Sequence, residues 1–158
     1  MKMPVAFIDG LAAHQLKEGL LVALLQRQTS GKGQEVSVSL YDTAVASLVN
    51  QASNYLMEGH VPQRIGSLHP NIAPYGELFT TADQKQGTFA IGSNRHFEGL
   101  CRFLELDNLI SDERFSVNAH RVKNRTALFE ILQPVILQHT SEDLNRAMLA
   151  QHIPFGIV

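Results

Sequence analysis

The stretch FIDGLAAHQLKEGLLVALLQRQTSGKGQEVSVSLYDTAVASL, residues 7–48, decides how the first part of this chain is expected to fold. Apolar residues recur at helical spacing over residues 11–28, which predicts a long helix. The turn residues TSGKG at 29–33 predict its end. Apolar and polar residues then alternate over residues 34–40, which predicts a half-buried strand.

The residues around this stretch extend the same pattern. Residues 4–8 are expected to form a short extended segment that ends at Asp9, and residues 41–58 a second helix. Taken alone, an aspartate that precedes a helix is most often an N-cap, because its carboxylate accepts hydrogen bonds from the first helix amides. Gly19 is unfavourable inside a helix and indicates close packing there, on another helix or on a bound group.

A boundary is expected at residues 59–74, which hold three of the six prolines and show no apolar periodicity. Such a stretch is typical of a linker or a functional loop. The predicted domains are therefore residues 1–58, of α/β character, and residues 75–158, a small α+β domain. In the second domain, strands are expected at 75–81 and 88–91 and at the end of the chain. The expected helical elements are a helix capped by Asn94, a helical turn at 111–115, a helical stretch at 118–138 broken at Pro134, and a helix capped at 140–143.

Composition excludes several classes of protein. The hydrophobic share of 44% and charged share of 18% are typical of a soluble globular protein. The net charge of -2 gives no reason to expect binding to nucleic acid or to an anionic membrane surface. The longest apolar run is too short to span a bilayer, and no signal-peptide core follows the start, so a cytoplasmic location is expected.

Cysteine and histidine usage argues against a metal site. The single cysteine, Cys101, lies in an apolar stretch and is predicted to be a buried, inert thiol. The seven histidines show no paired spacing of the kind that metal ligands need, so no metal is expected. The glycine turn at 31–33 lacks the preceding strand and following helix of a phosphate loop and is interpreted as a tight turn with a solvated lysine.

The order of Asp9, Gly19, the turn TSGKGQ and the helix YDTAVASL resembles the family III CoA-transferases. This family contains formyl-CoA, carnitine-CoA and succinyl-CoA transferases and the related 2-methylacyl-CoA racemases. The resemblance implies that Asp9 is the catalytic nucleophile, which forms a covalent thioester with CoA. It also implies an incomplete family III fold: part of a Rossmann-like, CoA-binding large domain (1–58), a linker loop (59–74) and a small α+β domain (75–158).

A second group of motifs is similar to the small domain of the same family. They are HPNIAPY at 69–75, FTTAD at 79–83, AIGSNRHF at 90–97 and the segment 112–125. The resemblance implies that His69, Asn71 and Tyr75 face the acyl end of the substrate. The alternative is a rigid, proline-fixed turn in which His69 or Asn71 caps backbone groups. The charged side chains in the last segment are interpreted as structural: Asp112, Arg114, Arg121 and Arg125.

The implied activity is transfer of CoA between carboxylic acids, with acyl-CoA and a carboxylate acceptor as partners. No metal and no cofactor bound covalently at rest are implied; CoA enters as substrate. A racemase is disfavoured, because the residues Ser93-Asn94-Arg95 stand where racemases carry a glutamate, and the histidine they use upstream is absent.

The resemblance covers only part of the family's length, so a catalytically incomplete fragment that acts as a folded or oligomerising module is the alternative. The apolar faces of residues 5–56 have no predicted partner in the chain. A homodimer, or association with a complementary chain, is therefore expected.

Overall fold

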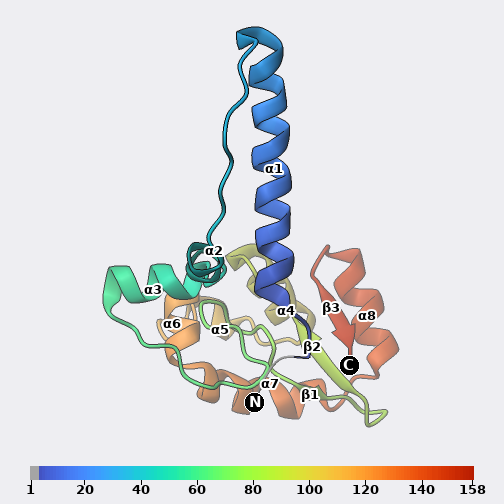
Figure 1. Cartoon of the computed structure of the whole chain (residues 1–158). Coiled ribbons are helices and arrows are strands. Elements are labelled where there is room, and N and C mark those ends of the chain that lie inside the picture. The colour runs from blue at the N-terminus through green and yellow to red at the C-terminus, as the bar shows by residue number, and fades with distance from the viewer. Residues whose placement is uncertain (1–3) are drawn as a thin grey trace. The chain divides into compact units, whose positions relative to one another are not determined.

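The computed structural model describes residues 4–158, so residues 1–3 of the predicted 1–58 domain lie outside it. The chain forms two compact units, one that ends at Gln63 and one that spans Arg64–Val158. The first unit is helical, and the second combines helices with a small antiparallel sheet (Figure 1). The chain is therefore a mixture of helices and a small sheet.

The first unit is built on one long helix. This helix, α1 (Phe7–Ser30), ends at the predicted turn and is followed by α2 (Leu40–Ala46) and α3 (Asn50–Glu58). Residues 31–39 return alongside α1 as an irregular segment (Figure 1). Gln34 Nε2 in this segment donates to Gln26 Oε1 of α1 at 2.7 Å, and Thr43 Oγ1 of α2 donates to Gln15 Oε1 of α1 at 2.8 Å.

Gly19 packs closely against the returning segment. A Cβ added to Gly19 would lie 2.6 Å from Cγ1 of Val36, so Val36 would have to move to admit any side chain there. The prediction of close packing at Gly19 is thus confirmed. Its neighbour in the described residues is the Val36 side chain of the irregular segment.

Both strands predicted in the first unit are wrong. Helix α1 begins at Phe7, inside the expected extended segment, and residues 34–39 form no strand. A strand needs a neighbour to pair its backbone groups, and the described part of this unit offers none, whereas a helix satisfies those groups locally. Asp9 is consequently in the first turn of α1, and the N-cap position belongs to Ala6. The predicted helix over residues 41–58 is interrupted at 47–49, between α2 and α3.

The first unit buries almost none of its apolar side chains. Among its described residues only Thr43 is buried. The large apolar side chains left exposed on α1 are Phe7, Leu16, Leu20, Leu21, Val22, Leu24 and Leu25. Because burial of apolar surface is the main stabilising term in folding, this unit cannot draw its stability from a core of its own.

The second unit contains a three-stranded antiparallel sheet in the order β1-β2-β3. Its strands are β1 (Phe79–Thr80), β2 (Gln86–Phe89) and β3 (Phe155–Ile157). Phe79 pairs with Gly87, and Phe89 pairs with Phe155. The three predicted strands are confirmed, although the first is shorter than expected and the second begins two residues earlier. An isolated bridge between Tyr75 and Ala90 extends the ladder beyond β1.

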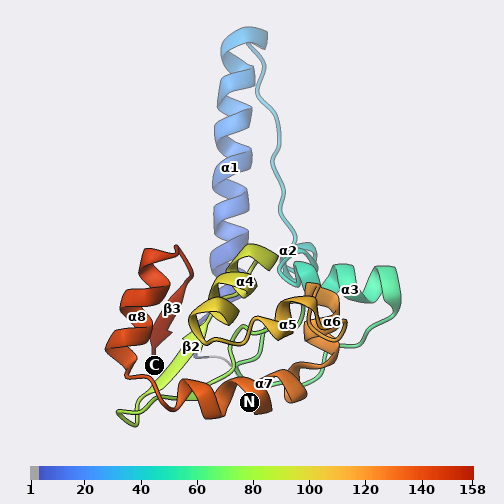
Figure 2. The same ribbon diagram turned by 180° about the vertical axis from the view of Figure 1, so that it is seen from behind.

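Five helices of the second unit are described; of these, α7 lies against β1 and α8 against β3 (Figure 2). They are α4 (Asn94–Phe103), α5 (Asn108–Ser111), α6 (Asn118–Lys123), α7 (Arg125–Ile136) and α8 (Ser141–Ala150). The cap predicted for α8 is confirmed, since Thr140 Oγ1 accepts a hydrogen bond from Asp143 N at 3.2 Å.

Two predicted helix boundaries are wrong. Pro134 lies inside α7, only two residues before its end, and the break falls at Asn124 instead. Pro134 has no N–H to donate to Glu130 O, so α7 lacks that hydrogen bond but continues for two residues beyond the proline. Ser93 caps α4 in place of Asn94, because the Ser93 hydroxyl accepts from His96 N. The helical turn predicted at 111–115 is present just after the short helix α5, since Ser116 N donates to Asp112 O at 2.8 Å.

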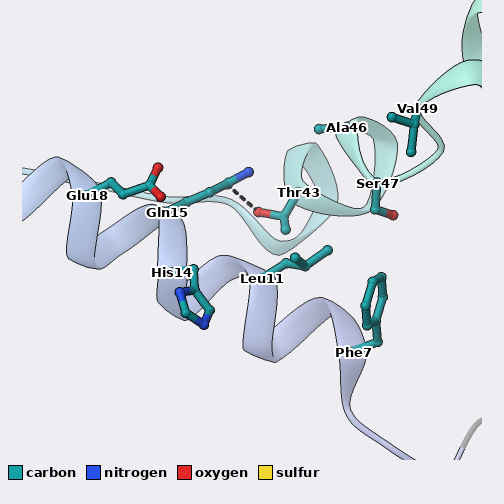
Figure 3. Close-up of a pocket in the computed structure, with 9 residues that line it drawn as sticks. All are labelled: Phe7, Leu11, His14, Gln15, Glu18, Thr43, Ala46, Ser47 and Val49. Atoms are coloured by element: carbon teal, nitrogen blue, oxygen red, sulfur yellow. Dashed lines mark hydrogen bonds between the residues drawn. The ribbon is translucent and has the colours of Figure 1, made fainter. Parts of the chain in front are cut away.

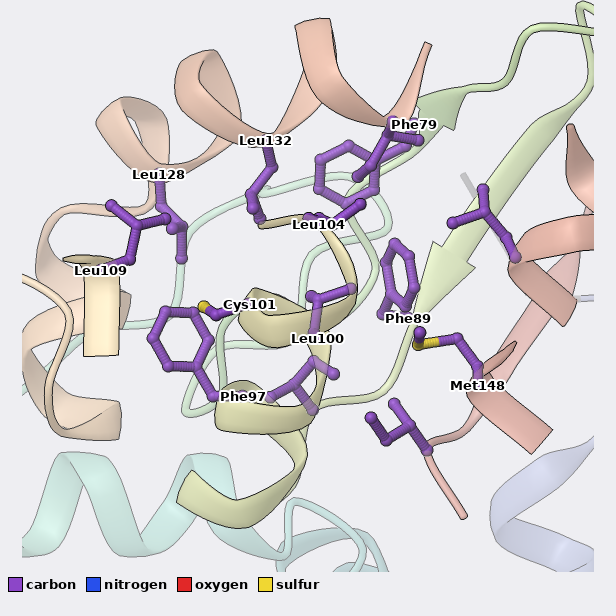
Figure 4. Packing of buried hydrophobic residues seen from close by; sticks show 14 of the residues in the cluster. Phe79, Phe89, Phe97, Leu100, Cys101, Leu104, Leu109, Leu128, Leu132 and Met148 are labelled. Carbon is purple, nitrogen blue, oxygen red and sulfur yellow. The ribbon is translucent and has the colours of Figure 1, made fainter. Parts of the chain in front are cut away.

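The core of the second unit joins the sheet to α4, α7 and α8 (Figure 4). Its labelled members come from the sheet, from α4 and the residue after it, and from α5, α7 and α8: Phe79, Phe89, Phe97, Leu100, Cys101, Leu104, Leu109, Leu128, Leu132 and Met148. Cys101 is fully buried, and burial raises the pKa of its thiol to about 12. The prediction of an inert thiol is confirmed, because only the thiolate is a nucleophile.

Asp83 ties the β1–β2 hairpin to the start of α8. Its Oδ1 accepts from Thr81 Oγ1 at 2.7 Å and from Ser141 N at 2.8 Å. Its Oδ2 accepts from Ser141 Oγ at 2.7 Å and lies 3.0 Å from Lys85 Nζ. The carboxylate therefore joins two segments that are far apart in the sequence.

Acid is expected to weaken this tie. The pKa of Asp83 is held well below its ordinary value of 3.8, chiefly by the hydrogen bond from the Thr81 hydroxyl and then by those from Ser141 and Lys85. Because the folded pKa is depressed, the stabilisation is complete above the ordinary value and is lost as pH falls through the folded pKa. Asp83→Asn should lower the free energy of unfolding at neutral pH and flatten its decline below about pH 4.

Urea unfolding at neutral pH and at about pH 3 measures both effects. Asp107→Asn is the matched control, since Asp107 lies before α5 and its side chain makes no capping hydrogen bond. An equally steep acid limb in the wild type and in the Asp83 variant would contradict the expectation.

Candidate functional site

Asp9 lies in the first turn of α1 with an exposed side chain. The N-terminus of a helix carries a partial positive charge, which favours the ionised form of a carboxylate placed there. The side chain is accessible to an incoming reactant because nothing in the unit covers it. These are two properties that a carboxylate nucleophile needs.

A cavity of about 370 Å³ lies beside another face of α1 (Figure 3). It is lined by Phe7, Leu11, His14, Gln15, Glu18, Thr43, Ala46, Ser47 and Val49. The hydrogen bond between Gln15 and Thr43 closes one part of it, and Phe7 and Leu11 form an apolar end. Asp9 is not among the lining residues: two positions after Phe7, it projects from the other side of the helix.

The second unit brings the other three candidate residues together in one loop. The rings of His69 and Tyr75 are stacked, with centroids 4.8 Å apart and planes at 20°. The backbone N–H of His69 donates to Tyr75 O at 2.8 Å, and the backbone N–H of Asn71 donates to His69 Nδ1 at 3.1 Å. The proline-fixed turn expected as the alternative is thus present, with His69 capping a backbone group. In this turn the rings of His69 and Tyr75 are stacked on each other.

The buried side chain of Arg121 supports this loop through hydrogen bonds. It is fully buried and its guanidinium donates to Ala73 O at 3.0 Å, Phe115 O at 2.8 Å and Asn94 Oδ1 at 2.9 Å. The guanidinium also lies over the ring of Phe97 at 4.5 Å. Burial lowers the pKa of Arg121, and the hydrogen bonds compensate for its lost hydration.

A cavity of about 350 Å³ lies beside the same loop. It is lined by Ser67, Leu68, Gly76, Glu77, Leu78, Arg125, Thr126 and Phe129. Gly76 is required here, because a Cβ would lie 2.0 Å from Ser67 O. The backbone approaches itself at this point, and the Ser67 hydroxyl donates to Gly76 O at 2.6 Å.

Sequence reasoning missed Glu77. This residue is 6% exposed, its Oε2 accepts from the backbone N–H of Tyr75, and its Oε1 lies 3.5 Å from Arg125 Nη1. The available signal was its spacing: Glu77 is two positions before the buried Phe79, so strand periodicity places both on the inner face. The structural role predicted for Arg125 and for the Asp112–Arg114 pair is confirmed, since both arginines form ion pairs.

Within residues 4–158, no three side chains of histidine, cysteine, aspartate or glutamate gather closely enough to hold a metal ion. Across that same range, none of the helices combines the length and the apolar character that crossing a membrane requires.

The candidate residues thus form two local sites, one at the start of α1 and one in the loop 69–77. The model of CoA-transferase family III matches residues 1–158, the full length of the chain. The chain belongs to CoA-transferase family III. The succinate–glutarate CoA-transferase of Agrobacterium fabrum is 34% identical to it over 156 residues, which cover 99% of this chain and 38% of the relative. The human succinyl-CoA:glutarate CoA-transferase is 34% identical over 155 residues, covering 93% of this chain and 34% of the relative.

Solved structures agree with this family assignment. A CaiB/BaiF family protein from Brucella suis is 36% identical, with a TM-score of 0.63 over 99% of this chain and 41% of the other. A hypothetical protein from Mycobacterium tuberculosis has a TM-score of 0.76 at 24% identity, which shows a shared fold; the match covers 98% of this chain and 40% of the other. The family III chain described here therefore spans about two fifths of the length of the proteins that it matches.

Proposed function

We propose that this chain is the central part of a family III CoA-transferase, which moves CoA between carboxylic acids through a thioester on Asp9. The observation that carries the proposal is the family match over residues 1–158, together with relatives named for transfer between succinyl-CoA and other dicarboxylates. The exposed carboxylate of Asp9 at the positive end of α1 supports its role as the nucleophile.

The proposed reaction has four balanced steps. The Asp9 carboxylate attacks the acyl-CoA carbonyl, which gives a mixed anhydride and releases CoA thiolate. The thiolate attacks the aspartyl carbonyl, which gives the aspartyl-CoA thioester and releases the donor carboxylate. The acceptor carboxylate attacks the thioester, forming a second anhydride and releasing thiolate. The thiolate then takes the acyl group and leaves Asp9 as a carboxylate. No redox partner enters any step.

The rest of the proposed assembly follows from the same assignment. Residues 1–58 are proposed to belong to a Rossmann-like large domain that binds CoA, residues 59–74 to a linker, and residues 75–158 to the small domain. His69, Asn71 and Tyr75 are proposed to face the acyl group of the substrate. A cytoplasmic location is proposed as well.

Intact-mass spectrometry after incubation with succinyl-CoA tests the nucleophile. We expect a mass increase of one CoA less one water on the wild type, localised to Asp9 by peptide mapping and absent from Asp9→Asn. Asp42→Asn is the matched control, since Asp42 is also an exposed aspartate in the first turn of a helix. It should keep the adduct.

The same incubation is repeated with the chain co-expressed with the N-terminal part of the Agrobacterium relative. An adduct seen only in that mixture would show that the chemistry needs a complementary piece. Absence of an adduct in both settings, or an adduct that persists in Asp9→Asn, would overturn the proposed nucleophile.

A second function is favoured by the exposed apolar surface of α1. Leu20, Leu21 and Leu24 are each about half exposed, at 49%, 54% and 55%. A chain with this surface is proposed to associate with a second copy or with a complementary chain, whether or not it turns over substrate. Sedimentation velocity that shows a clean monomer at all concentrations would contradict this.

A further inference from the structure

The loop 69–75 is an irregular segment. It contains no helix and no strand beyond the isolated bridge at Tyr75; within it, His69 N donates to Tyr75 O and Asn71 N donates to His69 Nδ1. A loop without regular secondary structure is ordered only if other parts of the structure hold it. Several of the groups that hold it come from α6 and α7.

Arg125, the first residue of α7, makes the principal contacts. Its Nη2 donates to His69 O at 2.7 Å and to Ile72 O at 2.9 Å. Its Nη1 faces Glu77, whose other carboxylate oxygen accepts from the backbone N–H of Tyr75. The ion pair therefore reaches the loop at both ends, at His69 and at Tyr75.

The pair is well shielded from water, which gives it more weight than a surface ion pair. The side chains of Arg125 and Glu77 are only 16% and 5% exposed. Removal of one partner from a shielded pair leaves the other charge without compensation. Asn118 adds a second support: its Nδ2 donates to Asn71 O at 2.7 Å, and its Oδ1 accepts from Ala73 N at 3.2 Å.

The geometry of the loop selects one tautomer of His69. The backbone N–H of Asn71 donates to His69 Nδ1, so Nδ1 must present a lone pair. In the neutral imidazole the proton is then on Nε2. The other tautomer would set two N–H groups against each other and lose the hydrogen bond.

We propose that Arg125 is a positioning residue that holds the loop 69–75 in shape and thereby keeps neutral His69 in the Nε2–H tautomer, ready to donate a hydrogen bond to an oxygen of the substrate's acyl group. The contact of His69 with the acyl oxygen rests on the proposed function. The hold of Arg125 on the loop, called the clamp below, and the tautomer of His69 do not, since they follow from the contacts of the loop alone.

The clamp is tested by long-range ¹H–¹⁵N spectra of the imidazoles in the labelled full chain, at a mildly alkaline pH. His69 should show a bare Nδ1 and a protonated Nε2. In Arg125→Met we expect the two His69 nitrogens to shift toward the averaged values of a mixture of tautomers. His120 is an internal reference with the other tautomer, because its Nδ1 lies 2.6 Å from Glu113 O and must carry the proton. Its signals should stay unchanged.

Two further variants keep the test decisive. Arg125→Lys retains the charge opposite Glu77 but lacks the forked guanidinium, so a smaller shift of the same sign is expected even if the methionine variant does not fold. Arg146→Met, on an exposed arginine of α8, should change nothing. A wild-type His69 pattern in a folded Arg125→Met or Arg125→Lys variant would overturn the clamp.

The acyl contact has its own readout in the rate of adduct formation at Asp9. His69→Gln keeps a side-chain N–H donor and should retain most of the rate, whereas His69→Leu should lose roughly 10-fold, as expected for one hydrogen bond. Equal rates in the two variants would overturn the acyl contact and leave the clamp standing. Failure of the wild type to form any adduct, alone or with the complementary piece, would overturn the proposed function and this contact together, while the clamp is judged by the spectra.

Discussion

Phe79→Ala is expected to lower the free energy of unfolding of the second unit by about 3–5 kcal/mol, the usual cost of truncating a buried phenylalanine. Phe79 is fully buried on β1. Its ring stacks on Phe129 at 5.0 Å and meets Phe89 edge-on at 5.6 Å. Truncation therefore leaves a cavity at the junction of the sheet and α7 and also removes two aromatic contacts.

Guanidinium-induced unfolding followed by circular dichroism measures this loss. Phe79→Leu should lose less, because leucine fills much of the same volume. Leu149→Ala, a truncation at a position of α8 that is 72% exposed, is the surface control and should change the unfolding free energy by less than about 0.5 kcal/mol. A Phe79→Ala variant as stable as this control would show that the junction is not the centre of the core.

Arg121→Met should have an effect of similar size for a different reason. Methionine replaces the buried stem, but Ala73 O and Phe115 O lose their donor inside the protein. Each unpaired buried carbonyl costs about 1–3 kcal/mol, so we expect a loss of about 2–5 kcal/mol. Asn94 Oδ1 also loses its partner, but Asn94 is exposed and water can replace it.

Chemical unfolding of Arg121→Met beside Arg102→Met tests this expectation. Arg102 is an exposed arginine of α4 whose ion pair with Glu98 is at the surface, and such pairs contribute little. Similar stability of the two variants would mean that the carbonyl groups find other donors. A large loss confined to Arg121→Met would show that a buried cation, rather than an apolar side chain, fixes this part of the core.

Family membership was predictable from the sequence because it depends on motifs that lie close together in the chain. Asp9, Gly19 and the turn TSGKGQ stand within one stretch, as do the residues of HPNIAPY. Their order is a property of the chain and needs no fold. The C-terminal end of α1 and the start of α8 were predictable for the same reason, since the caps Gly31 and Thr140 act on residues next to them.

The strands expected in the first unit were not predictable from the same pattern. Alternation over residues 34–40 shows that a segment suits a sheet, but a strand exists only where another strand pairs with it. The described part of the first unit offers no such partner, so the segment lies along α1 and packs Val36 against Gly19 instead. The break near Asn124 was missed because Pro134 is the stronger local signal for the end of a helix, although α7 continues through it to Ile136.

The sequence by itself determined the family, the candidate nucleophile Asp9 and the group of residues in the loop 69–75, because each is read from neighbours in the chain. Only the tertiary structure decided how that loop is held. The contacts of Arg125 with His69 O and of Asn118 with Asn71 O join residues that are 56 and 47 positions apart. Hydrogen bonds and burial act over a few ångströms in space, whatever the separation along the chain, so such contacts leave no local pattern in the sequence from which they could be predicted.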